Sequence, residues 1–337
     1  MNFFGIDLHK QIIVLTVRNE QRVILTTRRF PCSNEAQIVE FFASLGKYQA
    51  VVEATASYEW LWKLLEPTAD RLVLAHPKRM RVIAETKYKT DKLDAEKLSE
   101  FLALGLIPEA FRPSDRQREH RVLVRYRQRI KGRITAVRCR IRCVLANYNA
   151  DRKDLFTLDG LEYLKSVAIS PADRFVLDEL VDEWQGFCKR LAKINRKLKE
   201  FAKAAPVAEQ EARAVLATIP YVGAVTIDAV VSELGDVRRF RSQKHVVAYA
   251  GLAPGVRASA SRRHDLHITK EGSRILRWAM VEAAWRVVAK TARWGFQYHR
   301  LKQRLGAKKA IVAIARRLLC VMASMLRRGE RYRPALA

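Results

Sequence analysis

Short apolar runs alternate with amphipathic stretches over the first third of the chain, which is typical of strands that alternate with helices. The expected elements are strands over 3–6, 12–17 and 23–30, a helix between a Ser33 cap and Gly46, a strand over 51–53, a helix over 58–65, a strand over 72–74 and a helix over 78–85. Three strands followed by alternating helices and strands are the order of an RNase H-like fold. We therefore predict an α/β domain of this type over residues 1–105.

Beyond a linker with Pro108 and Pro113, the pattern changes to that of long helices. Residues 116–147 contain no proline and one glycine, and their apolar residues follow heptad spacing that Arg127 interrupts. A second helix, between residues 177 and 201, has apolar residues at alternating steps of three and four. These patterns predict a helical coiled-coil region over 106–210, whose two helices pair with each other or with a second chain.

The third region, over residues 211–330, is predicted to be mainly helical. The expected order is a turn at 219–223, a helix that ends at Gly235, a helix from a Ser242 cap to Gly251, a loop over 252–263, and helices that begin near Lys270 and Lys308. The turn resembles a helix-hairpin-helix element, in which Gly223 lets backbone N–H groups approach a phosphate. A plain turn is the alternative reading. The predicted fold class is thus α/β plus α.

The charge composition of the chain indicates what kind of partner it binds. The chain carries 63 Lys and Arg against 35 Asp and Glu, a net charge of +28, which favours a polyanionic partner, with nucleic acid ahead of a membrane surface. No apolar run approaches the roughly 18 residues of a membrane-spanning helix, and no secretory signal is evident. We expect a cytoplasmic, nucleoid-associated protein. Its five cysteines are scattered, odd in number and without zinc-site spacing, so we expect them to be reduced and structural.

The arginines of the long helix over 116–147 have few acidic residues among them. A solvated face is the alternative, but we favour a surface that follows nucleic-acid phosphates, with Arg125, Arg129 and Arg133 among its contacts. Further candidate contacts lie in the third region: Gly223, Arg257, Arg262, Arg263, Lys270 and Arg274.

Four carboxylates supply the candidate chemistry. Asp7 and Glu53 end predicted strands, and Asp91 and Asp94 share one helix face because they are three residues apart. Each one alone would be a surface charge or half of an ion pair. Together they predict a Mg²⁺ or Mn²⁺ site for phosphodiester chemistry, since hard divalent cations bind carboxylate oxygens. His9 lies two residues past Asp7 and has no assigned role.

A candidate nucleophile lies in the predicted loop. Ser259 and Ser261 stand beside Arg257, Arg262 and Arg263, so a hydroxyl could attack a DNA phosphate while arginines stabilise the developing charge. A basic loop that only touches the DNA backbone is the alternative, and these residues alone favour it. Two histidines, His264 and His267, flank the loop and could transfer protons.

Seven motifs run in order along nearly the whole chain. They are Gly5-Ile6-Asp7, Glu53-Ala54-Thr55, Lys89-Thr90-Asp91-Lys92-Leu93-Asp94-Ala95, Ile219-Pro220-Tyr221-Val222-Gly223, Phe240-Arg241-Ser242, Ala248-Tyr249-Ala250-Gly251-Leu252-Ala253-Pro254 and Ile268-Thr269-Lys270-Glu271-Gly272. Their order and content resemble the DEDD transposases of IS110-type bacterial insertion sequences, which are related to the Piv DNA invertases.

This resemblance implies a RuvC-like domain whose four acids hold Mg²⁺, a coiled coil, and a C-terminal transposase domain with a serine nucleophile. Ser259 matches that serine by position and Ser261 is the fallback, because Arg257 stands where the family usually has an aromatic residue. The serine would form a phosphoserine link to DNA. The family also implies a composite site in a homo-oligomer, a dimer or tetramer, and a structured noncoding bridge RNA that pairs with donor and target DNA.

We therefore predict a DNA transposase that acts as a site-specific recombinase. One alternative is a protein-only invertase or Holliday-junction nuclease, in which water attacks and Ser259 is dispensable. The other is a non-catalytic relative that only binds RNA or DNA.

Overall fold

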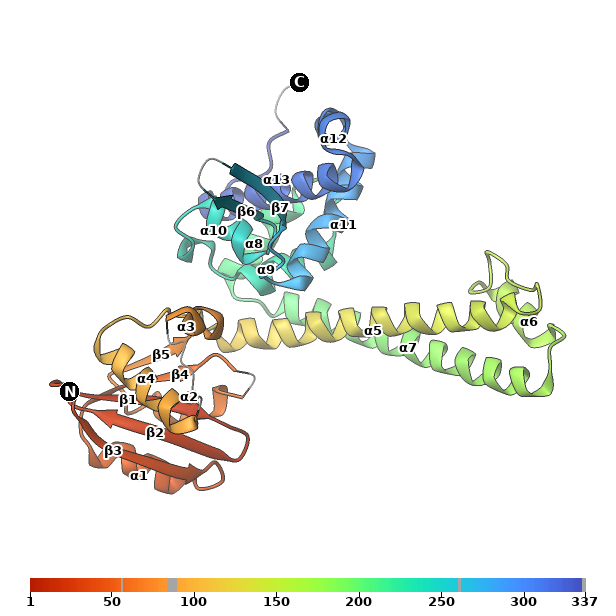
Figure 1. Ribbon diagram of the computed structural model, residues 1–337. Coiled ribbons are helices and arrows are strands. Elements are labelled where there is room, and N and C mark those ends of the chain that lie inside the picture. The colour runs from red at the N-terminus through yellow and green to blue at the C-terminus, as the bar shows by residue number, and fades with distance from the viewer. Residues whose placement is uncertain (56, 84–89, 260–261, 335–337) are drawn as a thin grey trace. The chain divides into compact units, whose positions relative to one another are not determined.

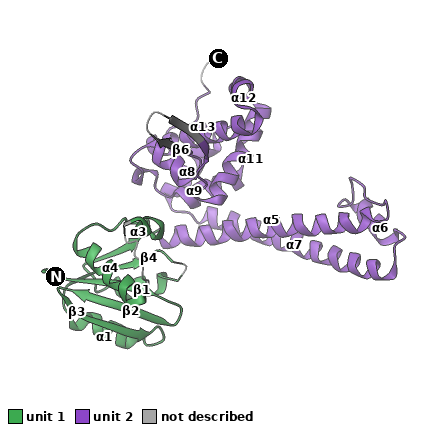
Figure 2. Cartoon of the chain, in the orientation of Figure 1, with its two compact units in different colours: residues 1–112 green, residues 113–337 purple. Residues whose placement is uncertain are grey.

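The computed structural model describes residues 1–55, 57–83, 90–259 and 262–334 (Figure 1). Their contacts divide the chain into two compact units, Met1–Arg112 and Pro113–Ala337 (Figure 2). The first unit contains a mixed α/β sheet and the second is mostly helical, as the sequence pattern predicts. Among the described helices, none combines the length and the apolar character needed to cross a bilayer.

Five strands form the sheet of the first unit, in the order β3-β2-β1-β4-β5. They are β1 (Asn2–Leu8), β2 (Ile12–Arg18), β3 (Ile24–Pro31), β4 (Tyr48–Glu53) and β5 (Arg71–Ala75). The first three pair antiparallel, whereas β1–β4 and β4–β5 are parallel. Strand β1 is thus central, and it lies beside β4 with their carboxyl ends at the same edge of the sheet.

Helices cover both faces of this sheet. The alternation of β1 sends Phe4, Ile6 and Leu8 into one core, which α1 (Glu35–Ser44) and α2 (Glu59–Leu65) complete. The opposite face packs against α4 (Asp91–Ala103), and α3 (Pro77–Ile83) lies between β5 and α4 in the chain. The N-cap of α1 is Asn34 instead of the predicted Ser33, because the Asn34 side chain accepts the Gln37 N–H at 3.2 Å.

The second unit begins with a helical hairpin of α5 (Asp115–Ala146) and α7 (Pro171–Lys203), with the short α6 (Leu158–Ser166) at its tip (Figure 1). The two long helices pair with each other, which decides between the alternatives left by their heptad patterns. Ile134, Val137 and Ile141 are buried along the seam. Where Arg127 interrupts it, the guanidinium donates to Asn195 at 2.7 Å across the pair.

The remainder of this unit packs around one apolar core. It consists of α8 (Val207–Ala217), α9 (Ala224–Leu234), a single turn at Val237–Arg239, α10 (Gln243–Tyr249), β6 (Pro254–Ser259), β7 (Arg262–Ile268), α11 (Arg274–Lys290), α12 (Ala292–Leu305) and α13 (Ala307–Arg328). Helices α8 and α9 flank the predicted turn at 219–223, and Gly223 is the N-cap of α9.

The prediction of a loop over 252–263 is wrong for most of its length. Strands β6 and β7 pair antiparallel from Pro254 opposite Ile268 to Ser259 opposite Arg262. The facing backbone N–H and C=O groups of the two strands pair with each other, and the sequence of the hairpin shows little of the apolar alternation by which a strand is recognised. The next helix accordingly begins at Arg274, and α12 and α6 are further elements without a counterpart in the prediction.

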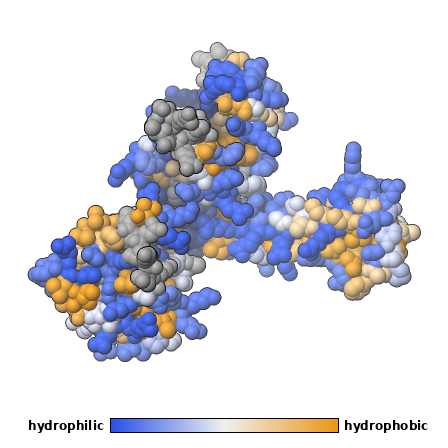
Figure 3. Space-filling view, in the orientation of Figure 1, coloured by the Kyte–Doolittle hydropathy of each residue, from blue (hydrophilic) through white to orange (hydrophobic). Residues whose placement is uncertain are grey.

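Polar side chains dominate the visible surface of the α5–α7 hairpin, whereas apolar side chains gather at its α6 end (Figure 3). Leu158 and Phe175 are two of the exposed apolar residues near that end, at 83% and 68% exposure. Such exposed apolar residues are typical of a surface that contacts another macromolecule.

Candidate active site

A close approach of α4 to β1 builds the candidate site. Gly5 precedes Asp7 by two residues and therefore faces the same side of the sheet, toward α4. A Cβ atom at Gly5 would lie 2.1 Å from the Ala95 carbonyl oxygen and 2.3 Å from the Ser99 nitrogen. Only glycine allows this packing, which brings the first turn of α4 over the end of β1.

The start of α4 is defined by Thr90, whose hydroxyl accepts the Leu93 N–H at 3.3 Å. This N-cap places Asp91 and Asp94 in the first turn, where the partial positive charge of the helix N-terminus favours carboxylates. Asp91 lies four residues before Ala95, and Asp94 lies four residues before Leu98. Both acids are therefore on the helix side that Ala95 and Leu98 bury against the sheet.

Asp7, His9 and Asp91 form the cluster at the centre of the site. The His9 Nε2 atom lies 3.1 Å from Asp7 Oδ2 and 3.4 Å from Asp91 Oδ1. One ligand atom from each of the three residues lies within 4.8 Å of the other two. Arg29 on β3 also approaches, with a nitrogen 3.9 Å from Asp91 Oδ2.

The surroundings of the Asp7 carboxyl shift its pKa. Burial raises the pKa of its carboxyl above the ordinary value of 3.8, and the negative charges of Asp94 and Asp91 add to the increase. The hydrogen bond and positive charge of His9 oppose it. A cation bound at this position would favour the ionised carboxylate and remove the cost of holding these acids together.

Glu53 and Asp94 lie beside the cluster without completing it. Ile6 pairs with Val52 in the parallel ladder, so Asp7 and Glu53 are the next residues on neighbouring strands and face the same side. Asp94 is near enough to raise the pKa of Asp7. Within the described residues, however, the set whose ligand atoms all fall within 4.8 Å contains His9 and neither of these acids.

The donor set suits a hard divalent cation. Asp7, Asp91, Asp94 and Glu53 offer carboxylate oxygens, which Mg²⁺ and Mn²⁺ prefer, and the imidazole of His9 is acceptable to Mn²⁺. A bound cation would neutralise the negative charge of the half-buried Asp7 carboxylate and of the two acids beside it. The chemistry of these side chains therefore fits the metal that the sequence predicts.

The predicted nucleophile lies in the other unit. Ser259 is the last residue of β6 and its backbone pairs with Arg262, the first residue of β7. It is thus at the tip of the hairpin, and Arg257 and Arg263 belong to the same two strands. Ser261, the fallback, lies outside the described residues.

The predicted nucleic-acid contacts occupy different environments. Arg129 and Arg133 are exposed on α5, Lys270 and Arg274 are exposed after β7, and Gly223 is exposed at the start of α9. Arg125 differs, because its guanidinium donates to Glu233 Oε1 at 3.1 Å. Glu233 is 1% exposed, so part of the charge of Arg125 is already used in holding α5 to α9.

Two contributions to the site were missed by reading the acids alone. His9 had no assigned role, and it proves to contact both Asp7 and Asp91. Gly5 was noted only as part of a motif, whereas its missing side chain sets the distance between β1 and α4. The sequence signal for Gly5 is its place two residues before Asp7 on the same strand, whereas His9 lies past the end of β1, where the strand alternation no longer sets the side-chain direction.

Comparison with known proteins gives a consistent result. A model of the IS110-type DEDD transposases matches residues 4–150, and a model described as the IS116/IS110/IS902 transposase family matches residues 213–300. The first match contains the acidic cluster and the second contains Ser259.

Individual relatives resemble the chain over most of its length. The transposase of insertion sequence IS1111A from Coxiella burnetii is 24% identical over 342 residues, which cover 99% of this chain and 92% of that one. A probable family 20 transposase from Pseudomonas aeruginosa is 24% identical over 98% of both chains. The pilin gene-inverting protein of Moraxella bovis is 25% identical over 84% of this chain and 81% of that one.

Proposed function

We propose that this chain, which belongs to the IS116/IS110/IS902 family of transposases, cleaves and exchanges DNA strands with its acidic cluster and Ser259. Membership makes it a DNA recombination enzyme. The observation that carries the proposal is the convergence of Asp7, His9 and Asp91 at the end of the central strand, in an RNase H-like sheet order.

Asp7, Glu53, Asp91 and Asp94 would hold the metal ion, Mg²⁺ or Mn²⁺. When bound, such an ion stabilises the negative charge that develops on the phosphate and its leaving oxygen. The protein's own contribution is to fix the carboxylates: Gly5 allows the close packing of α4, and the Thr90 cap sets the first turn. His9 positions Asp7 and Asp91 and is near enough to exchange a proton with either.

The Ser259 hydroxyl would be the nucleophile. Its oxygen forms a bond to a DNA phosphorus, one phosphodiester bond to a sugar oxygen breaks, and that oxygen takes up a proton while the serine proton passes to a base. Because the serine–phosphate bond keeps the energy of the broken phosphodiester bond, the DNA strand can be rejoined later without another energy source. The family match over residues 213–300 and the place of Ser259 at the tip of a basic hairpin support this role.

A structured noncoding RNA is the proposed guide for donor and target DNA, with a homo-oligomer, a dimer or tetramer, as the working form. The net charge of +28 and the exposed arginines of α5 support an RNA partner, and the apolar residues at the α6 end of the hairpin support self-association. RNA that copurifies with the chain, expressed with its flanking DNA, should be one structured species encoded beside the gene. Heterogeneous cellular RNA would contradict a guide.

A protein-only DNA invertase is the second candidate function, because the Moraxella relative is a pilin gene-inverting protein. A protein-guided enzyme of this kind would use the same acids without a copurifying RNA. The RNA measurement therefore separates the two candidates.

The acidic site is tested by DNA strand cleavage in the presence of Mg²⁺. Asp7→Asn and Asp91→Asn should each reduce cleavage at least about a hundredfold, because the loss of a preorganised charged group typically costs that much. Asp182→Asn is the matched control, since this exposed acid lies on α7 outside the cluster. Cleavage by Asp7→Asn at the wild-type rate would contradict the assignment.

A further inference from the structure

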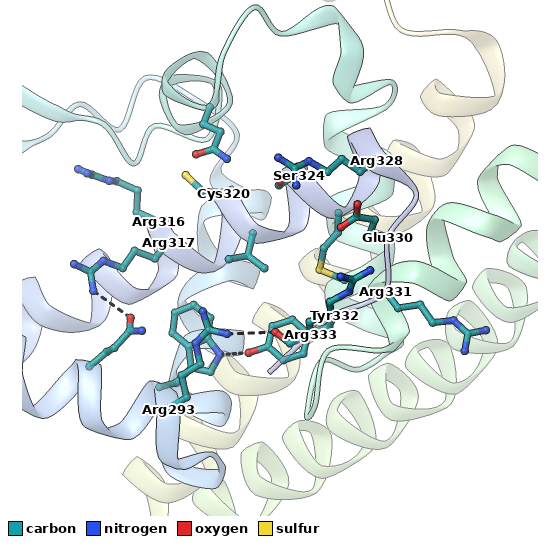
Figure 4. Close-up of a pocket in the computed structure, with 15 residues that line it drawn as sticks. Arg293, Arg316, Arg317, Cys320, Ser324, Arg328, Glu330, Arg331, Tyr332 and Arg333 are labelled. Atoms are coloured by element: carbon teal, nitrogen blue, oxygen red, sulfur yellow. Dashed lines mark hydrogen bonds between the residues drawn. The ribbon is translucent and has the colours of Figure 1, made fainter. Parts of the chain in front are cut away.

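An arginine-lined hollow in the second unit belongs to no site described above. It has a volume of about 760 Å³ and lies between α12, α13 and the segment that follows α13 (Figure 4). Its arginines are Arg293, Arg316, Arg317, Arg328, Arg331 and Arg333, and Glu330 is the single acidic residue of its lining.

The chain segment that forms one wall is held in place. The Tyr332 N–H donates to the Thr218 hydroxyl at 2.8 Å, and the buried Trp294 donates from Nε1 to the Tyr332 hydroxyl at 3.2 Å. The Arg293 guanidinium also reaches the Arg333 carbonyl at 3.4 Å. This anchoring keeps Arg331 and Arg333, on either side of Tyr332, beside the hollow.

The arginines of the hollow differ from others in this unit in their ion pairing. Within the part of the chain that the structure describes, none of the six forms an ion pair with a carboxylate. Elsewhere in the same unit, Arg116, Arg125 and Arg213 each contact an acidic side chain. Arg317 donates to the neutral amide of Gln297, at 3.1 Å.

Unpaired guanidinium groups that share a concave surface repel one another and concentrate positive potential. Such a surface is stabilised by an anion with several charged oxygens, and arginine is suited to phosphate because its planar fork donates two parallel hydrogen bonds. Six arginines around one hollow carry more positive charge than a single small anion would balance, which favours a polyanionic strand.

We propose that this hollow binds the sugar-phosphate backbone of the DNA on which the enzyme acts. The proposal rests on the action on DNA given above. It adds a binding site on α12, α13 and the C-terminal segment, separate from the hairpin of Ser259 and from the arginines of α5. Contacts of this kind position the nucleic acid without reading its sequence.

The test is a binding measurement that needs no cleavage. Fluorescence anisotropy with a labelled DNA duplex of arbitrary sequence, in EDTA and over a range of salt, compares the full chain with its Arg316→Gln/Arg328→Gln variant. Loss of two phosphate contacts should weaken binding about tenfold and reduce the slope of log K against log salt by about 2. Thermal unfolding of the variant checks that it is folded.

Lys302→Gln/Lys308→Gln is the charge-matched control. Both lysines are exposed on α12 and α13 and do not line the hollow, so this variant should weaken binding by less than about threefold. Equal weakening in the two variants would overturn the proposal, as would a loss confined to a labelled RNA duplex. Because Mg²⁺ is absent, a failure of the acidic site in the cleavage assay would leave this measurement unaffected.

Discussion

At the scale of single residues, the site depends on the missing side chain of Gly5 as well as on the carboxylates of the acids. Asp7 on β1 and Asp91 on α4 meet because the two backbones are in contact at Gly5. The glycine two residues before Asp7 in the sequence motif therefore has a steric explanation. The glycine sets a distance between a strand and a helix, and that distance sets the separation of the carboxylates.

Gly5→Ala tests this explanation. The added Cβ would overlap the backbone of Ala95 and Ser99, so α4 must move, at a cost of roughly 1–3 kcal/mol. Hydrogen exchange read by mass spectrometry should show faster exchange throughout α4, together with a loss of DNA cleavage. Gly132→Ala is the control, because nothing lies within 4 Å of its added Cβ and α4 exchange should not change. Wild-type exchange in Gly5→Ala would show that α4 does not depend on this contact.

The raised pKa of Asp7 gives a second prediction at this scale. Because burial raises this pKa above 3.8, protonation favours the folded state: the contribution is fully present below pH 3.8 and is lost as pH rises through the raised value. At neutral pH the ionised carboxylate thus destabilises the metal-free protein. Asp7→Asn should melt at a higher temperature than the wild type in EDTA at pH 7, and this difference should shrink as the pH falls toward 3.8.

The same melting experiment is repeated with Mg²⁺ in place of EDTA. Added Mg²⁺ should raise the melting temperature of the wild type by binding the folded state, and should have little effect on Asp7→Asn. A variant that melts below the wild type at pH 7 in EDTA would show that Asp7 is stabilising as an anion. That result would contradict the electrostatic description of the cluster.

At the scale of elements, buried ion pairs join the base of α5 to α8 and α9. His120 is 2% exposed and its Nε2 lies 3.1 Å from Asp228 Oδ1, which also accepts from Arg213 at 2.7 Å. Glu233 on α9 accepts from Arg125 and lies 3.7 Å from Arg121. The charges of Arg121 and Arg125, near the start of α5, are therefore balanced at least in part by Glu233 within the protein.

Glu233→Gln should therefore destabilise the second unit. The substitution leaves Arg121 and Arg125 without their buried counter-charge, which should lower the free energy of unfolding by roughly 2–4 kcal/mol. This range lies below the usual one for a broken buried pair because Arg125 is half exposed. Urea denaturation followed by circular dichroism measures this. Glu162→Gln, which breaks an exposed pair with Lys165, should cost less than about 1 kcal/mol. Equal effects of the two substitutions would rule out an anchoring role for Glu233.

The elements that the sequence predicts well are those with a strong period and clear ends. The five strands of the sheet and the helix that ends before Gly235 carry such signals. The hairpin of β6 and β7 does not, since its strands are held by their mutual backbone ladder, with small and basic residues instead of an apolar alternation. Helix α12 carries buried Trp294, Tyr298 and Leu301 at helical spacing, but the basic residues between them obscure this pattern in the sequence.

The candidate site was predictable in its residues but not in its geometry. The sequence places Asp7 and Glu53 at the same edge of the sheet, because each ends a strand that carries an acidic residue in the predicted RNase H-like fold. It does not show that His9 is the third member of the innermost cluster, since side-chain direction past the end of a strand depends on tertiary packing. The choice between intrachain and interchain pairing of α5 and α7 likewise depends on the intervening segment, which allows them to fold back.

At the scale of the whole molecule, the acids and the serine belong to different compact units. Asp7 and Asp91 lie in Met1–Arg112, and Ser259 lies in Pro113–Ala337. The proposed reaction needs both, so it predicts that variants in either unit abolish the same product. That product is a covalent link between protein and DNA.

Detection of this link is the measurement that tests the central claim most directly. The chain, with any RNA that copurifies with it, is incubated with Mg²⁺ and DNA labelled on each strand in turn. The mixture is then denatured and separated by size, so that label which migrates with the protein reports a covalent protein–DNA bond. The wild type and Asp182→Asn should form the adduct, whereas Ser259→Ala and Asp7→Asn should both lack it. Cleaved DNA without any adduct, or an adduct that persists in Ser259→Ala, would contradict the account.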